Sequence, residues 1–261
     1  MSLAPVKSLR LVSVDAVELE ITGVHGDRRF YLVDDAGNLV NAKRVPRLLA
    51  VRPAVEDGRL RLCFPDGTDV ETDVELGDRV ETNFYGRPVA GRFVDGPWSD
   101  PLSELAGRRI RLARTEREGD GVDRGRRAGA SLVSTASLDA LRVATGASGP
   151  VDGRRFRMTI GVEGVEPHGE DGWIGHRVRV GGAVVVVRAH VGRCATTTLD
   201  PDRGVRDLDT LGAIAAYRAD VPPESRCHSE CGARSSSPGL SSWATQSNRR
   251  ADSVASWPGP S

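Results

Sequence analysis

Short apolar runs separated by turn signals dominate the first part of the chain. A strand with roughly alternating side chains is expected over residues 5–19. Further apolar runs lie at 30–33, 48–52, 60–64, 80–84 and 89–94. Pairs such as Asp57-Gly58 and Asp66-Gly67 separate these runs, as turns separate strands. Many short strands with little helix favour a β-sandwich or barrel, so residues 1–96 are predicted to form an N-terminal β domain.

The pattern from residue 97 onward predicts more strands with a few short helices. Residues 97–107 are typical of a linker plus one helix, and the charged, glycine-rich residues 116–129 of a loop. Strands are expected over 154–162, 178–180 and 183–188, and a helix over 208–217. Residues 97–221 are therefore predicted to form a second domain, and the fold class is mainly β (α+β).

A strand that feeds a helix is predicted just after this loop. Ser134 or Thr135 is the natural N-cap, and Gly146 is the expected end of the helix. Leu138, Leu141 and Val143 would form its apolar side.

The last residues, 222–261, are rich in serine and show neither the helical nor the strand period. Such a composition buries too little apolar surface to offset the entropy of ordering. This segment is interpreted as a low-complexity tail, either disordered or not native to the fold.

Composition restricts the setting and the partners. The 36 basic and 36 acidic residues give no net charge, which argues against a general polyanion binder, so no nucleic-acid partner is expected. Cys63, Cys194, Cys227 and Cys231 show no framework spacing, which favours a reduced, cytoplasmic setting. The apolar runs are too short for a signal peptide or a membrane span, so no membrane partner is expected.

One block carries candidate chemistry: Arg193-Cys194, then three threonines, then Asp200-Pro201 and Gly204. A guanidinium next to a thiol stabilises the thiolate, which is both a nucleophile and a soft metal ligand. The Asp-Pro-x-x-Gly segment is typical of a tight turn that fixes the direction of the cysteine. The alternative is a cysteine packed as a small hydrophobe, with Arg193 in solvent.

This block resembles the cysteine motif of the MOSC family, the domain named after the C-terminal part of molybdenum cofactor sulfurases. Pro5-Val6-Lys7-Ser8 and Gly26-Asp27-Arg28 match family motifs in the same order. The resemblance extends from about residue 5 to about residue 217 and is closest to the amidoxime-reducing-component-like subgroup. It implies an N-terminal β domain followed by a MOSC-type β-barrel with a few short helices. The strands that complete the barrel in the family are missing after residue 221, so the second domain is predicted to be truncated.

The resemblance implies that the molybdenum cofactor (Mo-molybdopterin) is bound, with Cys194 as the metal's sulfur ligand and catalytic residue. The residues it assigns to the rest of the cofactor are Lys7, Ser8, Arg28, Ser134, Thr135, Arg157 and Arg193. Guanidinium groups and the amides of a helix N-terminus suit the anionic phosphate. Where the family has Pro-Asn, this chain has Met158-Thr159, so the Thr159 hydroxyl would replace the asparagine amide.

The activity implied is the reduction of N-hydroxylated or N-oxygenated small molecules at molybdenum. Electrons would come from a separate ferredoxin- or flavoprotein-like carrier, because the sequence has no cluster-binding set of cysteines. Two other functions stay open. One is a sulfur carrier with a Cys194 persulfide, or a cofactor-handling protein. The other is a β-barrel binding module without catalysis.

Overall fold

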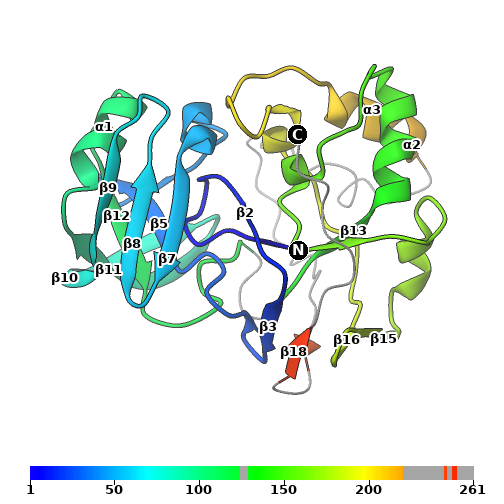
Figure 1. Cartoon of the computed structure of the whole chain (residues 1–261), viewed down its shortest axis with the longest axis horizontal. Coiled ribbons are helices and arrows are strands. Elements are labelled where there is room, and N and C mark those ends of the chain that lie inside the picture. The colour runs from blue at the N-terminus through cyan, green and yellow to red at the C-terminus, as the bar shows by residue number, and fades with distance from the viewer. Residues whose placement is uncertain (124–128, 220–243, 246–248, 252–261) are drawn as a thin grey trace.

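The computed structural model describes residues 1–123, 129–219, 244–245 and 249–251. This part of the chain is built mostly of strands, with three α-helices and four short 3-10 helices. It forms two lobes side by side (Figure 1). The mainly β class predicted from the sequence is confirmed. No helix in the described part of the chain is long and apolar enough to cross a membrane.

An antiparallel five-stranded sheet forms the centre of the first lobe. Its order is β10 (Glu75–Phe84), β11 (Arg87–Asp95), β12 (Ile110–Thr115), β5 (Phe30–Asp34) and β6 (Leu39–Val40). A three-stranded meander accompanies it, with β7 (Arg52–Glu56), β8 (Arg59–Cys63) and β9 (Asp69–Asp73). Helices α1 (Ser99–Ala106) and η1 (Pro46–Ala50) belong to the same lobe. β12, which lies beyond the predicted domain limit at residue 96, thus completes the sheet of this lobe.

The core of the first lobe centres on Trp98, which is completely buried. Its indole N–H donates to the carbonyl oxygen of Leu60 at 3.2 Å, so burial leaves no polar atom of the ring unsatisfied.

The strand predicted over 48–52 is wrong at its start. Pro46 opens the 3-10 helix η1 there, and the strand begins only at Arg52.

The second lobe contains several small sheets. Its strands are β1 (Ser2–Leu3), β2 (Val12–Ser13), β3 (Val17–Glu20), β4 (Gly23–Val24), β13 (Leu132–Ser134), β14 (Ile160–Val162), β15 (Arg177–Val180) and β16 (Ala183–Val186). β13 and β14 pair in parallel, whereas β15 and β16 form a hairpin. Val17, Leu19 and Val24 share one buried cluster with Leu132 and Val185. The first 24 residues therefore contribute to the core of the second lobe.

The continuous strand predicted over 5–19 is wrong. Val6 makes a single parallel bridge with Phe30, and a turn follows in which Ser8 has a φ of 75°. The strand predicted over 154–162 is also shorter than expected. Residues Gly153–Phe156 form η2, Arg157 leaves it with a φ of 52°, and only β14 is extended.

The predicted strand-to-helix unit is confirmed. Helix α2 (Thr135–Thr145) follows β13, with Ser134 as N-cap and Gly146 as a left-handed C-cap. Val143, however, is 71% exposed and does not belong to the apolar side. The remaining helices are η3 (Gly169–Trp173), η4 (Ala195–Thr198) and α3 (Thr210–Tyr217).

Most of the predicted tail lies outside the described residues. Two short segments of it are described as strands. β17 (Ala244–Thr245) pairs with β16, and β18 (Arg249–Ala251) pairs with β3. Figure 1 shows β18 beside β3 at the lower edge of the second lobe.

Candidate functional site

Three predicted site residues, Lys7, Arg28 and Arg157, meet in one cluster of positive charge. The Lys7 side chain is only 6% exposed and forms an ion pair with Asp123. Burial lowers the pKa of Lys7, the charge of Asp123 opposes this, and the charges of Arg28 and Arg157 lower it further. Burial, followed by the charge of Arg28, lowers the pKa of Arg157 to about 10. The fold thus brings three cationic side chains together in a largely buried region.

Three of the predicted site residues have an unusual backbone conformation. The φ values of Ser8, Arg28 and Arg157 are 75°, 52° and 52°, in the left-handed region that residues with a Cβ seldom adopt. They are three of the six non-glycine residues with positive φ in the described chain. Such conformations persist where the surroundings hold them, and they concentrate at functional sites.

Neighbouring segments hold this backbone. The buried Asp27 accepts a hydrogen bond from the amide of Ala4 at 2.9 Å and pairs with the Arg28 guanidinium. Gly121 packs so closely on the carbonyl oxygen of Arg28 that a Cβ there would overlap it. This contact places Asp123, two residues further along the chain, next to Lys7.

Two residues of the first lobe complete the cluster. Arg87 donates to the carbonyl oxygens of Asp120 at 2.6 Å and Val122 at 2.9 Å, which fixes the segment that carries Asp123. The Phe84 ring lies 5.5 Å from Lys7 Nζ. Neither Phe84 nor Arg87 was singled out from the sequence. Their only signal is that they flank the tight turn between β10 and β11.

Cys194 is the N-cap residue of η4 and is half-buried. Its Sγ donates to the Thr196 hydroxyl at 3.4 Å, and its carbonyl oxygen accepts from the amide and hydroxyl of Thr197, both at 3.0 Å. Thr197 also shares a 2.7 Å hydrogen bond with Thr210, at the start of α3. The threonines after Cys194 thus hold the cysteine loop in place.

Arg157 is one positive charge within electrostatic range of Cys194. An attractive interaction with Cys194 raises the pKa of Arg157, against the larger effect of burial. Arg193 contacts the two residues that flank Arg157. Its Nη1 lies 3.6 Å from Met158 Sδ and its guanidinium 5.1 Å from the centre of the Phe156 ring. Arg193 also lines a cavity of about 120 Å³, and its predicted contact with the cofactor stays a prediction.

The N-terminus of α2 receives an internal carboxylate. Glu170 accepts from the Ser134 hydroxyl at 2.9 Å, the Ser134 amide at 3.2 Å and the Ser137 hydroxyl at 2.7 Å. Thr135 donates to the carbonyl oxygen of Val162 at 3.4 Å. The anion expected at this helix end is therefore supplied by the protein, and the cofactor roles of Ser134 and Thr135 stay predictions.

Thr159 is buried at the start of the paired strands β13 and β14, three residues before the partner of Ser134. Its amide donates to the Ser131 carbonyl oxygen at 3.0 Å, and its own carbonyl oxygen accepts from the Ser2 amide at 2.8 Å. The structure thus places its backbone in the core of the second lobe. Its predicted role toward the cofactor stays a prediction.

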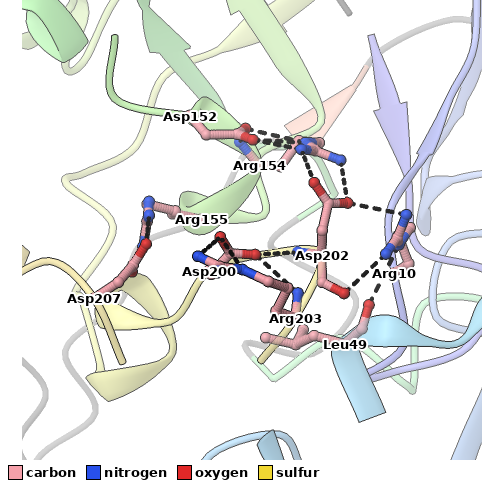
Figure 2. A network of polar contacts seen from close by, with 9 residues as sticks. All are labelled: Arg10, Leu49, Asp152, Arg154, Arg155, Asp200, Asp202, Arg203 and Asp207. Carbon is pink, nitrogen blue, oxygen red and sulfur yellow. Dashed lines mark hydrogen bonds and ion pairs between the residues drawn. The ribbon is translucent and has the colours of Figure 1, made fainter. Parts of the chain in front are cut away.

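A polar junction fixes the cysteine loop relative to Arg157 (Figure 2). Asp202 accepts two hydrogen bonds from Arg154, at 2.9 and 2.7 Å, and lies 2.9 Å from Arg10 Nη1. Arg155 forms a bidentate pair with Asp207 at 2.7 and 2.8 Å. Because Arg154 and Arg155 lie in η2, directly before Arg157, these pairs join the segments that carry Arg157 and Cys194.

The donor set suits a group with an anionic end and a thiophilic metal. Arg157 Nη2 is buried and makes no hydrogen bond within the described residues. A buried donor left in this state is costly, and a phosphate or another anionic acceptor would satisfy it. The Cys194 thiol, which lies within electrostatic range of Arg157, offers a soft ligand.

The sequence is similar to known domain families and proteins over most of its length. Residues 1–92 match the MOSC N-terminal beta barrel domain, and residues 120–232 match the MOSC domain. A mitochondrial amidoxime-reducing component 1 of Xenopus laevis is 28% identical over 236 residues, which cover 79% of this chain and 68% of the relative. Its namesake from Mus musculus is 27% identical over 244 residues, or 84% of this chain and 71% of the relative.

A molybdenum cofactor sulfurase of Oryza sativa subsp. japonica is also similar. It is 26% identical over 252 residues, which cover 82% of this chain. The match spans only 30% of that sulfurase, so most of the relative lies outside the shared region.

Proposed function

The chain belongs to the MOSC family, and on this premise we propose that it binds the molybdenum cofactor and reduces N-hydroxylated or N-oxygenated small molecules. The observation that carries the proposal is the cluster of Lys7, Arg28 and Arg157, in which Arg157 lies within electrostatic range of Cys194. Desolvated like charges are unfavourable by themselves and become favourable when an anion joins them.

Each residue has a definite task in this proposal. Lys7, Arg28 and Arg157 would bind the phosphate and pterin end, with Ser8 as a hydroxyl donor on the same turn. Cys194 would ligate molybdenum through its thiolate. When bound, the cofactor supplies the exchange of oxygen and electrons with the substrate. The family resemblance also assigns Ser134, Thr135, Thr159 and Arg193 to contacts with the cofactor.

The protein's own contribution is binding and orientation. The junction of Asp202 with Arg10 and Arg154 keeps the cysteine loop against η2, so Cys194 and Arg157 keep a fixed relation. A fixed ligand and a fixed anion site leave the bound group one orientation, which is what a reactive metal centre requires.

The test is the molybdenum content per chain after expression in cells that make the cofactor. Wild type should contain close to one equivalent, and Cys194→Ala clearly less. Cys63→Ala is the matched control, because Cys63 is the other partly exposed free cysteine of the described chain and lies on β8 in the first lobe. Equal metal in wild type and Cys194→Ala would remove the metal-ligand role. No metal in any variant would contradict cofactor binding.

A sulfur carrier is the second candidate, and the similarity to proteins named molybdenum cofactor sulfurase favours it. It needs the same thiol and the same cations but no turnover of a small substrate. Trapping a Cys194 persulfide in protein that contains no molybdenum would favour it. Reduction of a hydroxylamine with an artificial donor would favour the reductase.

The reductase requires an external source of electrons, which we assign to a ferredoxin- or flavoprotein-like carrier. The cytoplasmic compartment stays a prediction from cysteine usage.

A further inference from the structure

An arginine-rich face lies next to the cysteine loop, made of Arg44, Arg47, Arg52, Arg203 and Arg206. All five residues are exposed. The segment from residue 41 to residue 52 contains Lys43 in addition and has no acidic residue. We call these five arginines the arginine face.

Packing beneath the surface brings its two halves together. Leu199, in the cysteine loop (residues 193–204), forms a buried cluster with Ala42 and Leu49 of the first lobe. Gly204 lies directly against the carbonyl oxygen of Pro46. Since Arg47 follows Pro46 and Arg203 precedes Gly204, these arginines are neighbours across the two lobes.

The nearby carboxylates are already used. Asp200 pairs with Arg203 at 3.0 Å, and Asp202 is shared by Arg10 and Arg154, as Figure 2 shows. Within the described residues, the guanidinium groups of Arg44, Arg47, Arg52 and Arg206 have no carboxylate partner within ion-pair distance. Because the whole chain has no net charge, this face is a local excess of positive charge.

The arginine face begins close to the candidate metal ligand. Leu199 follows Cys194 by five residues, which span at most about 18 Å even when fully extended. Leu199 also bridges to Arg206. A protein docked on this face would therefore place its own redox centre near Cys194.

We propose that the arginine face is the docking surface for an acidic one-electron carrier protein. This inference rests on the proposed reductase function. Removal of one oxygen atom from an N-hydroxylated compound as water consumes two electrons and two protons. A one-electron carrier must therefore dock and leave twice in each turnover. Arginine surfaces serve such encounters well, because complementary charge accelerates association without requiring tight binding.

The experiment compares two electron donors on holoenzyme. One is a reduced plant-type [2Fe–2S] ferredoxin, an acidic protein, and the other is reduced methyl viologen, which needs no docking surface. The variant is Arg47→Glu with Arg206→Glu. The control is Arg79→Glu with Arg109→Glu, two first-lobe residues with side chains 86% and 82% exposed.

We expect the second-order rate constant with ferredoxin to fall by about tenfold or more at low salt in the variant, and the difference to shrink at high salt. The rate with methyl viologen should not change, and the control should behave as wild type. Equal ferredoxin rates in variant and control would overturn the proposal. An equal loss with both donors would also overturn it, since the effect would then lie in the enzyme itself.

Direct binding separates this inference from the proposed function. If wild type shows no turnover even with methyl viologen, the reductase proposal fails. Titration calorimetry of oxidised ferredoxin at low salt then decides the docking surface. Binding that is lost in the variant supports it, and no binding by wild type contradicts it. Tighter binding of a DNA duplex than of ferredoxin, abolished in the variant, would overturn the choice of partner.

Discussion

Arg28 donates a hydrogen bond from Nη2 to the backbone carbonyl oxygen of Arg157 at 3.1 Å, so one cation holds the backbone that positions another. Both residues have a φ of 52°. A fold that only required stability would separate these charges. Their convergence is what connects the architecture to an anionic ligand.

Replacing Arg157 by methionine should stabilise the cofactor-free protein and weaken its molybdenum loading. At neutral pH the buried guanidinium is charged at a cost, so we expect the free energy of unfolding to rise by about 1 kcal/mol or more. The pKa of Arg157 is lowered to about 10, so the cost is fully present below that pH. It is relieved as pH rises through 10, because the folded protein then releases a proton that the unfolded chain keeps. Urea unfolding at pH 7 and pH 10.5 should show the advantage of the variant shrinking.

Arg155→Met is the matched control for that variant. Arg155 is also buried, but both of its terminal nitrogens donate to Asp207 and only its Nε lacks a partner within the described residues. Its loss should lower the free energy of unfolding by about 2 kcal/mol, the opposite sign. If both variants changed stability in the same direction, the unsatisfied state of Arg157 would not be the cause.

Asp202→Ala should loosen the junction between the cysteine loop and η2. It leaves Arg10 and Arg154, whose side chains are only 21% and 20% exposed, without this carboxylate, and we expect a loss of about 1.5–3 kcal/mol. Hydrogen bonding to Arg154 is the main cause of the lowered pKa of Asp202. Its contribution is therefore present above about pH 4 and is lost as pH falls through the lowered value.

The exposed pair of Arg61 and Asp69 provides the comparison for Asp202. Asp69→Ala should lower the free energy of unfolding much less than Asp202→Ala in the same experiment, because solvent screens that pair. Similar losses in both variants would mean that the junction has no special role.

Glu170→Ala should destabilise the start of α2. It removes the carboxylate that accepts from Ser134 and Ser137, and we expect a loss of about 1–2 kcal/mol. Since this carboxylate occupies the helix end, molybdenum per chain should stay at the wild-type level. A clear loss of metal in folded Glu170→Ala would show that the helix end takes part in cofactor binding.

Gly204→Ala should be among the most damaging single changes in the cysteine loop. Gly204 has a φ of 67°, and an added Cβ would overlap the carbonyl oxygen of Pro46. We expect a loss of about 2–3 kcal/mol from conformation and overlap together. Gly107→Ala has the same φ of 67° with open space around the new atom, and it should cost only about 1 kcal/mol. Thermal unfolding of the two variants measures the overlap by difference.

The strand-to-helix unit could be predicted because its signals are local. Ser134 and Gly146 cap α2 by their own chemistry, and no distant residue is needed to recognise them. The turn at Asp200 is likewise local, since its carboxylate accepts from the amides of Asp202 and Arg203. The mainly β class follows from many such signals added together.

The geometry of the site could not be predicted in the same way. Arg193 packs against Phe156 and Met158, and the latter contact joins residues 35 positions apart in sequence. Arg157 reaches the cation cluster because η2 and the left-handed turn after it bring it there. The hydrogen bond from Ser134, at the start of α2, to Glu170 joins residues 36 positions apart in sequence, so no local sequence pattern predicts it.

Residues from the first 24 positions pack in the core of the second lobe, and this has a consequence for building hybrid proteins. A chimera cut at residue 96 would carry Val17, Leu19 and Val24 away from Leu132 and Val185, with which they pack. It would also strip β12 from between β11 and β5. Exchange between relatives should therefore succeed only with two crossovers, one near residues 25–29 and one after residue 115. The boundary between the two family domains in sequence thus differs from the boundary between the two lobes in space.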